Sequence, residues 1–153
     1  MNKDFIINFF RIIILLMFQV LILKEINLEN SSSRYINIII YQLGIILLPV
    51  AMPTFIIMLI AFTCGLIVDS FYGSIGIHAS ACLWMTAARP IILKFLEPKS
   101  GYSISQKPSS PSLGIFWFLQ FVGYSSFIYF LSYYILDVFT LVYFGQILFV
   151  FRL

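Results

Sequence analysis

Three ionisable residues lie within or beside long apolar runs of the sequence: Asp69, His78 and Arg89. Such a group costs at least about 2.5–3.5 kcal/mol at membrane depth, so each should have a partner or a function. Asp69 precedes Gly73 by four residues and His78 follows Gly76 by two, and a tight turn between the glycines would bring both side chains together. The pair could hydrogen-bond as a polar clasp, contact water and headgroups separately, or transfer a proton.

The spacing around these residues predicts two closely packed helices. One helical face carries four residues at i, i+4, i+7 and i+11, namely His78, Cys82, Met85 and Arg89. The preceding apolar run carries small residues in register with Asp69, at Ala61 and Gly65. Small residues at this spacing allow helix backbones to approach closely in lipid, although glycine and alanine are also simply frequent in membrane helices.

The sequence offers no familiar catalytic pattern. It has no nucleophile elbow, zinc-protease helix, phosphate-binding loop or dinucleotide-binding glycine motif. The chain has one histidine, which excludes a site of several histidines, and the spacing of Cys64 and Cys82 fits no zinc or haem motif. We therefore expect a protein that is not an enzyme and that has no cofactor and no metal.

The composition indicates a membrane protein. Hydrophobic residues make up 61% of the 153 residues, beside only nine basic and six acidic side chains. Soluble domains hold about 25% charged residues, so this chain cannot cover a water-facing globule. The net charge of +3 comes from basic residues in loops and at span ends, without a basic patch among aromatic residues, so no nucleic-acid partner is expected.

The apolar runs predict an all-α polytopic membrane helix bundle that forms a single transmembrane domain over residues 1–153. Five to six transmembrane helices are expected, at residues 5–23, 35–50, 54–71, 77–96, 113–136 and 138–153. Asp137 marks the expected turn before the last run, and Pro90 is a candidate kink. The last run is short for a bilayer, so either this helix tilts or the chain is truncated.

The basic residues also predict an orientation. With a cytoplasmic N-terminus and six spans, the expected cytoplasmic side holds Lys3, Arg11, Lys94, Lys99, Lys107 and Arg152. The outer side then holds Lys24 and Arg34. The polar segment 97–112 is therefore expected to be a cytoplasmic loop, and the Gly73–Gly76 turn is expected to face outward.

Several blocks of this sequence resemble the rod shape-determining protein MreD family. The most specific block runs from Gly65 through Asp69 to Phe71, and it is followed by Gly76 to Ala81 and then Arg89-Pro90. Supporting features are Gln19 before an apolar run, Tyr35-Ile36-Asn37 with Tyr41, Leu48-Pro49, and Gly101-Tyr102. The resemblance extends to about Leu136. It departs at Ile38-Ile39, where many relatives carry a proline, and at the short C-terminus.

The resemblance implies a membrane scaffold subunit of the bacterial cell-elongation complex in the cytoplasmic (inner) membrane. Its expected partners are MreC, MreB filaments, RodA with its transpeptidase partner, and membrane lipid. The fold is expected to be similar to the substrate-binding subunits of energy-coupling-factor transporters. The structural or partner-binding candidates are Gly65, Asp69, Gly76, His78, Arg89 and Pro90.

A transport subunit that captures a vitamin-type solute is the main alternative. Asp69 and His78 would supply polar groups in an outward-facing apolar pocket. If the side chains of Asp69 and His78 form a pair, Asp69→Ala and His78→Ala should give similar, non-additive losses of stability.

Overall fold

A computed structural model describes residues 2–23, 39–74, 76–102, 108 and 113–150 of the chain. These residues form no β-strand. Their α-helices are α1 (Asn2–Phe18), α3 (Gln42–Ile46), α4 (Thr54–Tyr72), α5 (Ile77–Phe95) and α6 (Ile115–Val150), and a π-helical turn, η1 (Gln19–Leu23), continues α1. The expected all-α class is confirmed.

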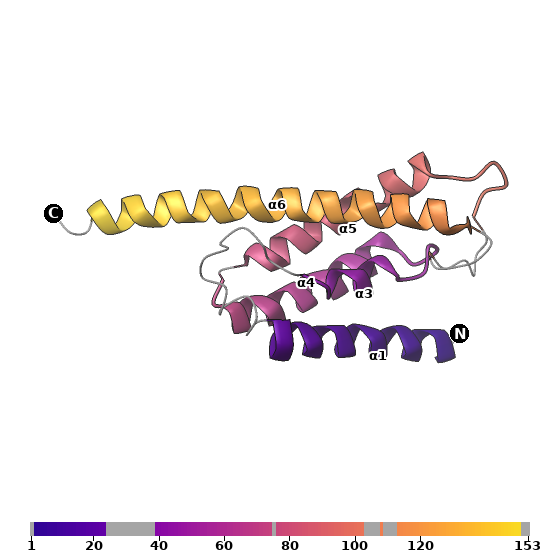
Figure 1. Cartoon of the computed structure of the whole chain (residues 1–153), viewed down its shortest axis with the longest axis horizontal. Coiled ribbons are helices and arrows are strands. Elements are labelled where there is room, and N and C mark those ends of the chain that lie inside the picture. Colours follow the sequence, from indigo (N-terminus) through magenta and orange to yellow (C-terminus); the bar gives the residue numbers. More distant parts are fainter. Residues whose placement is uncertain (1, 24–38, 75, 103–107, 109–112, 151–153) are drawn as a thin grey trace.

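Three stretches of the described chain are long and apolar enough to cross a membrane: Ile6–Leu23, Thr54–Tyr72 and Ile115–Phe139. The chain is thus a helical membrane protein, with fewer spans than the five to six expected. α5 has 19 residues, the same length as α4, but its polar residues leave it outside this group. It runs beside α4 and α6 (Figure 1).

The break expected between residues 113–136 and 138–153 is absent, because α6 continues without interruption from Ile115 to Val150. Its 36 residues correspond to about 54 Å of helix. A lone aspartate lowers helix propensity by only about 0.7 kcal/mol, and neither proline nor glycine stands beside Asp137. The prediction of a turn at Asp137 was therefore wrong.

The helix expected over residues 35–50 is also absent from the described part of this range. Residues 39–50 contain only the five-residue helix α3, followed by turns around Pro49. Proline disfavours helical conformation at the residue before it, which explains the early end. The main chain of this segment is irregular, and side chains from other helices satisfy several of its polar groups, as described below.

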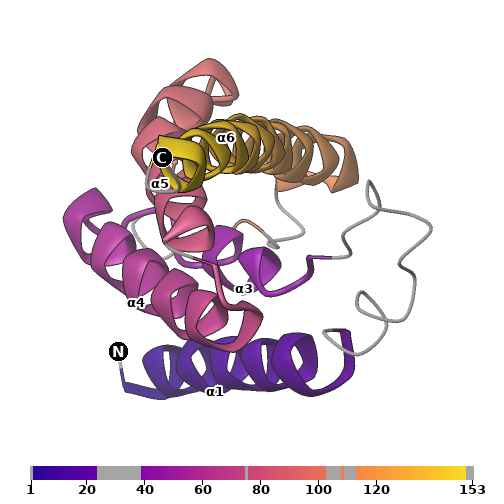
Figure 2. The same cartoon turned by 90° about the vertical axis from the view of Figure 1, so that its left-hand side faces the viewer.

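The helices form three layers when the molecule is viewed along its length (Figure 2). α5 and α6 form one side, α3 and α4 lie in the middle, and α1 forms the other side. The core consists of residues from the inner faces of these helices, among them Ile57, Ala61, Val68, Ala81, Met85 and Phe121. The start of α1 and the end of α5 lie at the same end of the molecule (Figure 1), as the expected topology requires.

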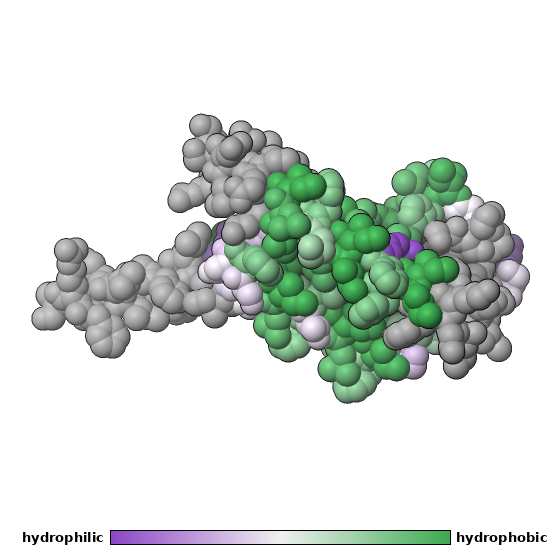
Figure 3. Space-filling view, turned by 90° about the horizontal axis from the view of Figure 1, so that it is seen from below, coloured by the Kyte–Doolittle hydropathy of each residue, from purple (hydrophilic) through white to green (hydrophobic). Residues whose placement is uncertain are grey.

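The outer surface is strongly apolar. Large side chains point outward from every long helix, including Phe10 on α1, Phe55 on α4, Ile91 on α5 and Phe116 on α6. The face that carries α1 is almost continuously hydrophobic where its residues are described (Figure 3). A soluble protein rarely exposes such a surface, whereas lipid is its natural solvent.

Candidate functional site

The turn between α4 and α5 is built around the carboxylate of Asp69. One oxygen accepts the His78 main-chain N–H at 3.0 Å and the Ser74 hydroxyl, and the other accepts the Ala79 N–H at 2.9 Å. These amides belong to the first turn of α5, where they have no intrahelical acceptor. Asp69 is only 4% exposed, so α4 supplies a buried cap to the positive end of the next helix.

The Asp69 carboxylate therefore binds the main chain of α5 and not the His78 side chain that the sequence suggested as its partner. Asp69 binds the main chain of His78, and no hydrogen bond between the carboxylate and the imidazole occurs among the described residues. The glycines explain the geometry, because Gly73 and Gly76 both adopt left-handed backbone conformations with φ of 67° and 73°. These residues let the chain reverse within a few residues and place α5 against the end of α4.

Gly65 confirms the predicted close approach of the two helices. A Cβ atom at this position would lie 2.4 Å from the Ala79 Cα, a distance that no real side chain tolerates. Ala61 and Ala79 are also fully buried at this junction. Backbone contact of this kind is a principal source of helix association in lipid.

The His78 ring points into the bundle and begins a chain of hydrogen bonds. Its Nδ1 lies 2.8 Å from the Tyr129 hydroxyl, which lies 3.0 Å from the Tyr41 hydroxyl. The Tyr41 hydroxyl also lies 3.3 Å from the Cys82 Sγ. All four side chains are at most 2% exposed, and we call them the buried polar chain. It joins α5, α6 and the segment before α3.

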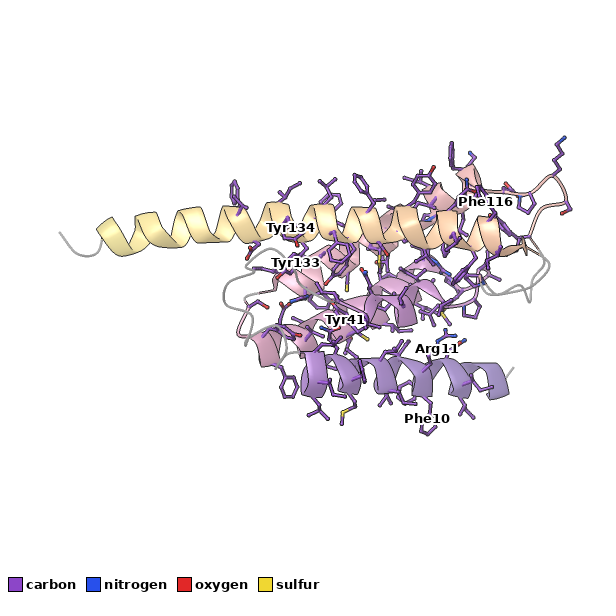
Figure 4. The ribbon with its side chains drawn as sticks, in the orientation of Figure 1. Phe10, Arg11, Tyr41, Phe116, Tyr133 and Tyr134 are labelled. Atoms are coloured by element: carbon purple, nitrogen blue, oxygen red, sulfur yellow. The ribbon has the colours of Figure 1, made fainter. Side chains whose placement is uncertain are left out.

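Aromatic rings surround the buried polar chain. The centroids of Tyr72 and Tyr133 lie 5.4 and 5.0 Å from that of His78. Tyr41 lies inside the bundle and Tyr133 points from α6 towards it (Figure 4). Tyrosines that cluster near the end of a membrane span, as Tyr129, Tyr133 and Tyr134 do, are typical of an interfacial belt. Tyr129 does not belong to such a belt, because it is 0% exposed.

Two arginines bind the irregular segment after α3. The Arg89 Nη2 donates to the carbonyls of Leu48 at 2.5 Å and Pro49 at 3.3 Å, and the Arg11 Nη2 donates to that of Leu47 at 2.9 Å. The Arg89 guanidinium also lies 5.9 Å from the centre of the Phe121 ring. Non-helical backbone is tolerated at membrane depth only where protein groups satisfy it, and these arginines provide donors.

Gln19 serves the same segment at its other end. Its Oε1 accepts the Ile40 N–H at 2.8 Å, while its Nε2 donates to the Tyr72 hydroxyl at 2.9 Å. Gln19 is the first residue of the π-helical turn η1. A π-helical turn contains one more residue than an α-helical turn, so the side chains that follow it point in a different direction around the helix. Gln19 is fully buried, so a polar residue in the first span holds the neighbouring chain.

Aromatic residues cap the far end of α5. The Tyr102 hydroxyl donates to the Leu93 carbonyl at 2.8 Å, and the Trp117 indole N–H donates to that of Leu96 at 2.7 Å. Burial raises the pKa of the Tyr102 phenol above its usual value. The turn passes through Gly101 with φ of 71°. Of the expected loop 97–112, only residues 97–102 and 108 are described.

Pro90 takes part in none of the hydrogen bonds described above. It is exposed, and α5 continues through it to Phe95. The other candidate residues are buried or line the turn, and the predicted stripe of His78, Cys82, Met85 and Arg89 is 5% exposed or less at every position. The roles of Tyr41, Tyr72 and Tyr129 were not predicted from the sequence. The available signal was that each of these tyrosines lies within or at the end of an apolar run.

The arrangement favours a structural use of these polar groups. Both Asp69 oxygens already accept hydrogen bonds, and the His78 ring is committed to Tyr129. The described residues contain no group of three His, Cys, Asp or Glu side chains suited to a metal ion. The two cysteines are free and buried.

Comparison with known proteins assigns no relative to the chain. No family model matches it, and neither a curated protein nor a solved structure shows significant similarity.

Proposed function

We propose that the chain is a non-enzymatic membrane scaffold of the bacterial cell-elongation complex. It would link MreC and the RodA–transpeptidase pair to cytoplasmic MreB filaments, and so regulate cell shape and wall insertion. It would reside in the inner membrane with a cytoplasmic N-terminus.

One observation carries the proposal: the two most specific blocks that resemble the MreD family, which contain Gly65 and Gly76, meet at one structural junction. Gly65, Asp69, Gly76 and the start of α5 together form the turn and the close contact between α4 and α5. Residues that are dispersed through 15 positions of sequence thus act as one unit. This agreement between a sequence resemblance and one local structure supports the proposal better than apolar composition does.

The distribution of polar groups supports a scaffold over a chemical role. Several buried polar side chains are engaged with helix ends, with the irregular segment 39–50 or with each other. The outer face of α5 instead carries apolar residues at Trp84, Ile91 and Phe95, spaced at i, i+7 and i+11. This exposed stripe offers a continuous surface for a partner's transmembrane helix.

Depletion of the protein in its native bacterium tests the function. We expect rod-shaped cells to become rounded and wall insertion to lose its normal pattern. Unchanged shape and unchanged insertion after complete depletion would show that the proposal is wrong.

Photo-crosslinking tests the partners. A crosslinking residue placed at Trp84 or Ile91 should capture MreC or RodA in native membranes. The matched control is Cys82 on the same helix, which is 0% exposed and should capture neither. Capture of neither protein from any exposed position on the long helices would remove the proposed partners.

Cysteine labelling tests the orientation. Ser100 is exposed next to Lys99, and the two native cysteines are buried, so Ser100→Cys gives a single accessible thiol. We expect an impermeant maleimide to label it only after the membrane is opened. Labelling in intact spheroplasts would reverse the orientation.

A further inference from the structure

α1 and α4 enclose a crevice of about 410 Å³ near the end where α1 begins. Its floor is formed by buried side chains, including Ile12, Leu16 and Cys64. Its rim is formed by exposed residues, including Phe9 and Leu59. The crevice therefore opens on the apolar outer surface, towards lipid.

Asn8 is the unusual residue in this crevice. It is only 6% exposed and lines the crevice, and no hydrogen bond of its amide occurs among the described residues, although the amide atoms are not fully enclosed by protein. An amide that faces lipid without a hydrogen-bond partner is unfavourable, because it has lost water without gaining a replacement. The side chain can donate two hydrogen bonds and accept at its oxygen, so it requires a polar ligand atom inside an apolar groove.

The dimensions of the crevice select the kind of ligand. Lining residues run from Asn8 to Leu16 on α1 and from Leu59 to Ile67 on α4, which corresponds to about 12 Å along each helix. This length is close to the depth of one leaflet, since the hydrocarbon core is about 30 Å thick. The mean cross-section is then about 34 Å², whereas a helix with side chains is about 10–12 Å wide. A partner helix is too wide for this space, and an extended acyl chain fits it.

We propose that this crevice binds one acyl chain of a membrane glycerophospholipid, with the ester carbonyl of that chain accepting a hydrogen bond from the Asn8 amide. The chain extends from Asn8 past Ile12 towards Leu16. This inference does not depend on the proposed scaffold function.

Native mass spectrometry of the detergent-purified full chain tests the proposal. The probes are a phosphatidylglycerol with two ester-linked palmitoyl chains and its ether-linked analogue with the same headgroup and chain length. The ether lipid lacks the carbonyl acceptor. We expect the ester lipid to bind about 5–10-fold more tightly, as one net hydrogen bond would give.

Three variants complete the test. Asn8→Leu should abolish the preference for the ester lipid, and because it adds an apolar side chain to a buried site it should preserve folding. Thr63→Phe should fill the crevice and weaken both lipids. Ser70→Phe is its matched control, because Thr63 and Ser70 are both exposed on α4 and each hydroxyl binds the carbonyl four residues earlier at 2.8 Å. Equal binding of the two lipids, a preference that survives Asn8→Leu, or equal effects of the two phenylalanine variants would overturn the proposal.

Discussion

Replacing Asp69 by alanine should destabilise the protein by about 2–4 kcal/mol. The change removes the acceptor of two buried amides in α5, those of His78 and Ala79, and of the Ser74 hydroxyl. Each buried donor left without an acceptor costs about 1–3 kcal/mol, and loss of a helix cap alone costs about 0.5–2 kcal/mol. The upper parts of these ranges do not add fully, because water can reach a loosened turn.

The same geometry predicts how Asp69→Ala combines with His78→Ala. The second variant removes the imidazole and its contact with Tyr129 but keeps the main-chain N–H that Asp69 binds. The coupling between the two losses should therefore stay below about 1 kcal/mol, even though the residues are neighbours. A direct side-chain pair, as the sequence suggested, would instead give a coupling in the upper part of the range of about 0.5–3 kcal/mol that residues in contact show.

Equilibrium unfolding in mixed micelles can measure this coupling. The purified variants would be titrated with dodecyl sulfate in a mild detergent and followed by tryptophan fluorescence. Ser70→Ala serves as the control, because its exposed hydroxyl bonds only within α4, to Leu66. A coupling above about 1 kcal/mol between the Asp69 and His78 variants would refute the assignment of the carboxylate to the α5 main chain.

Other substitutions test the remaining contacts by the same unfolding assay. Gly65→Ala should destabilise strongly because its Cβ would meet the Ala79 backbone at 2.4 Å, whereas Gly123→Ala, with open space around it, should be neutral or stabilising. Arg89→Met should cost about 2–4 kcal/mol by leaving two carbonyls without their donor, and Arg89→Lys should recover part of that loss. Tyr129→Phe should cost about 1–3 kcal/mol by interrupting the buried polar chain, and the exposed Tyr124→Phe should cost less than about 0.5 kcal/mol.

Local signals in the sequence predicted the centre of the fold well. α4 begins at Thr54 and ends at Tyr72, one residue beyond the predicted end, and α5 ends one residue before its predicted end. Glycines at both sides of the turn and small residues at helical spacing specify this hairpin directly. The burial of the stripe from His78 to Arg89 followed from helical periodicity alone.

The incorrect predictions concern contacts between distant parts of the chain. Tyr129 lies 51 residues from His78 and 88 from Tyr41, so no local pattern distinguishes its buried hydroxyl from an interfacial one. Hydropathy likewise could not distinguish two alternative structures for residues 35–50, a membrane-spanning helix and an apolar segment that contains only a short helix. Both outcomes contain the same residues, and they differ in which groups satisfy the main chain.

The irregular segment and the two arginines that bind it stabilise each other. The carbonyls of Leu47, Leu48 and Pro49 lie beyond the end of α3, where a helix leaves its last carbonyl groups without donors. Arg11 and Arg89 would each be costly inside a membrane protein without acceptors. The hydrogen bonds between the arginines and the carbonyls offset the cost of burying each of them. Replacing the arginines by apolar residues would leave these carbonyls without donors. Straightening the segment into a helix would leave the arginines without acceptors. The two features must therefore change together in any chain that keeps this fold.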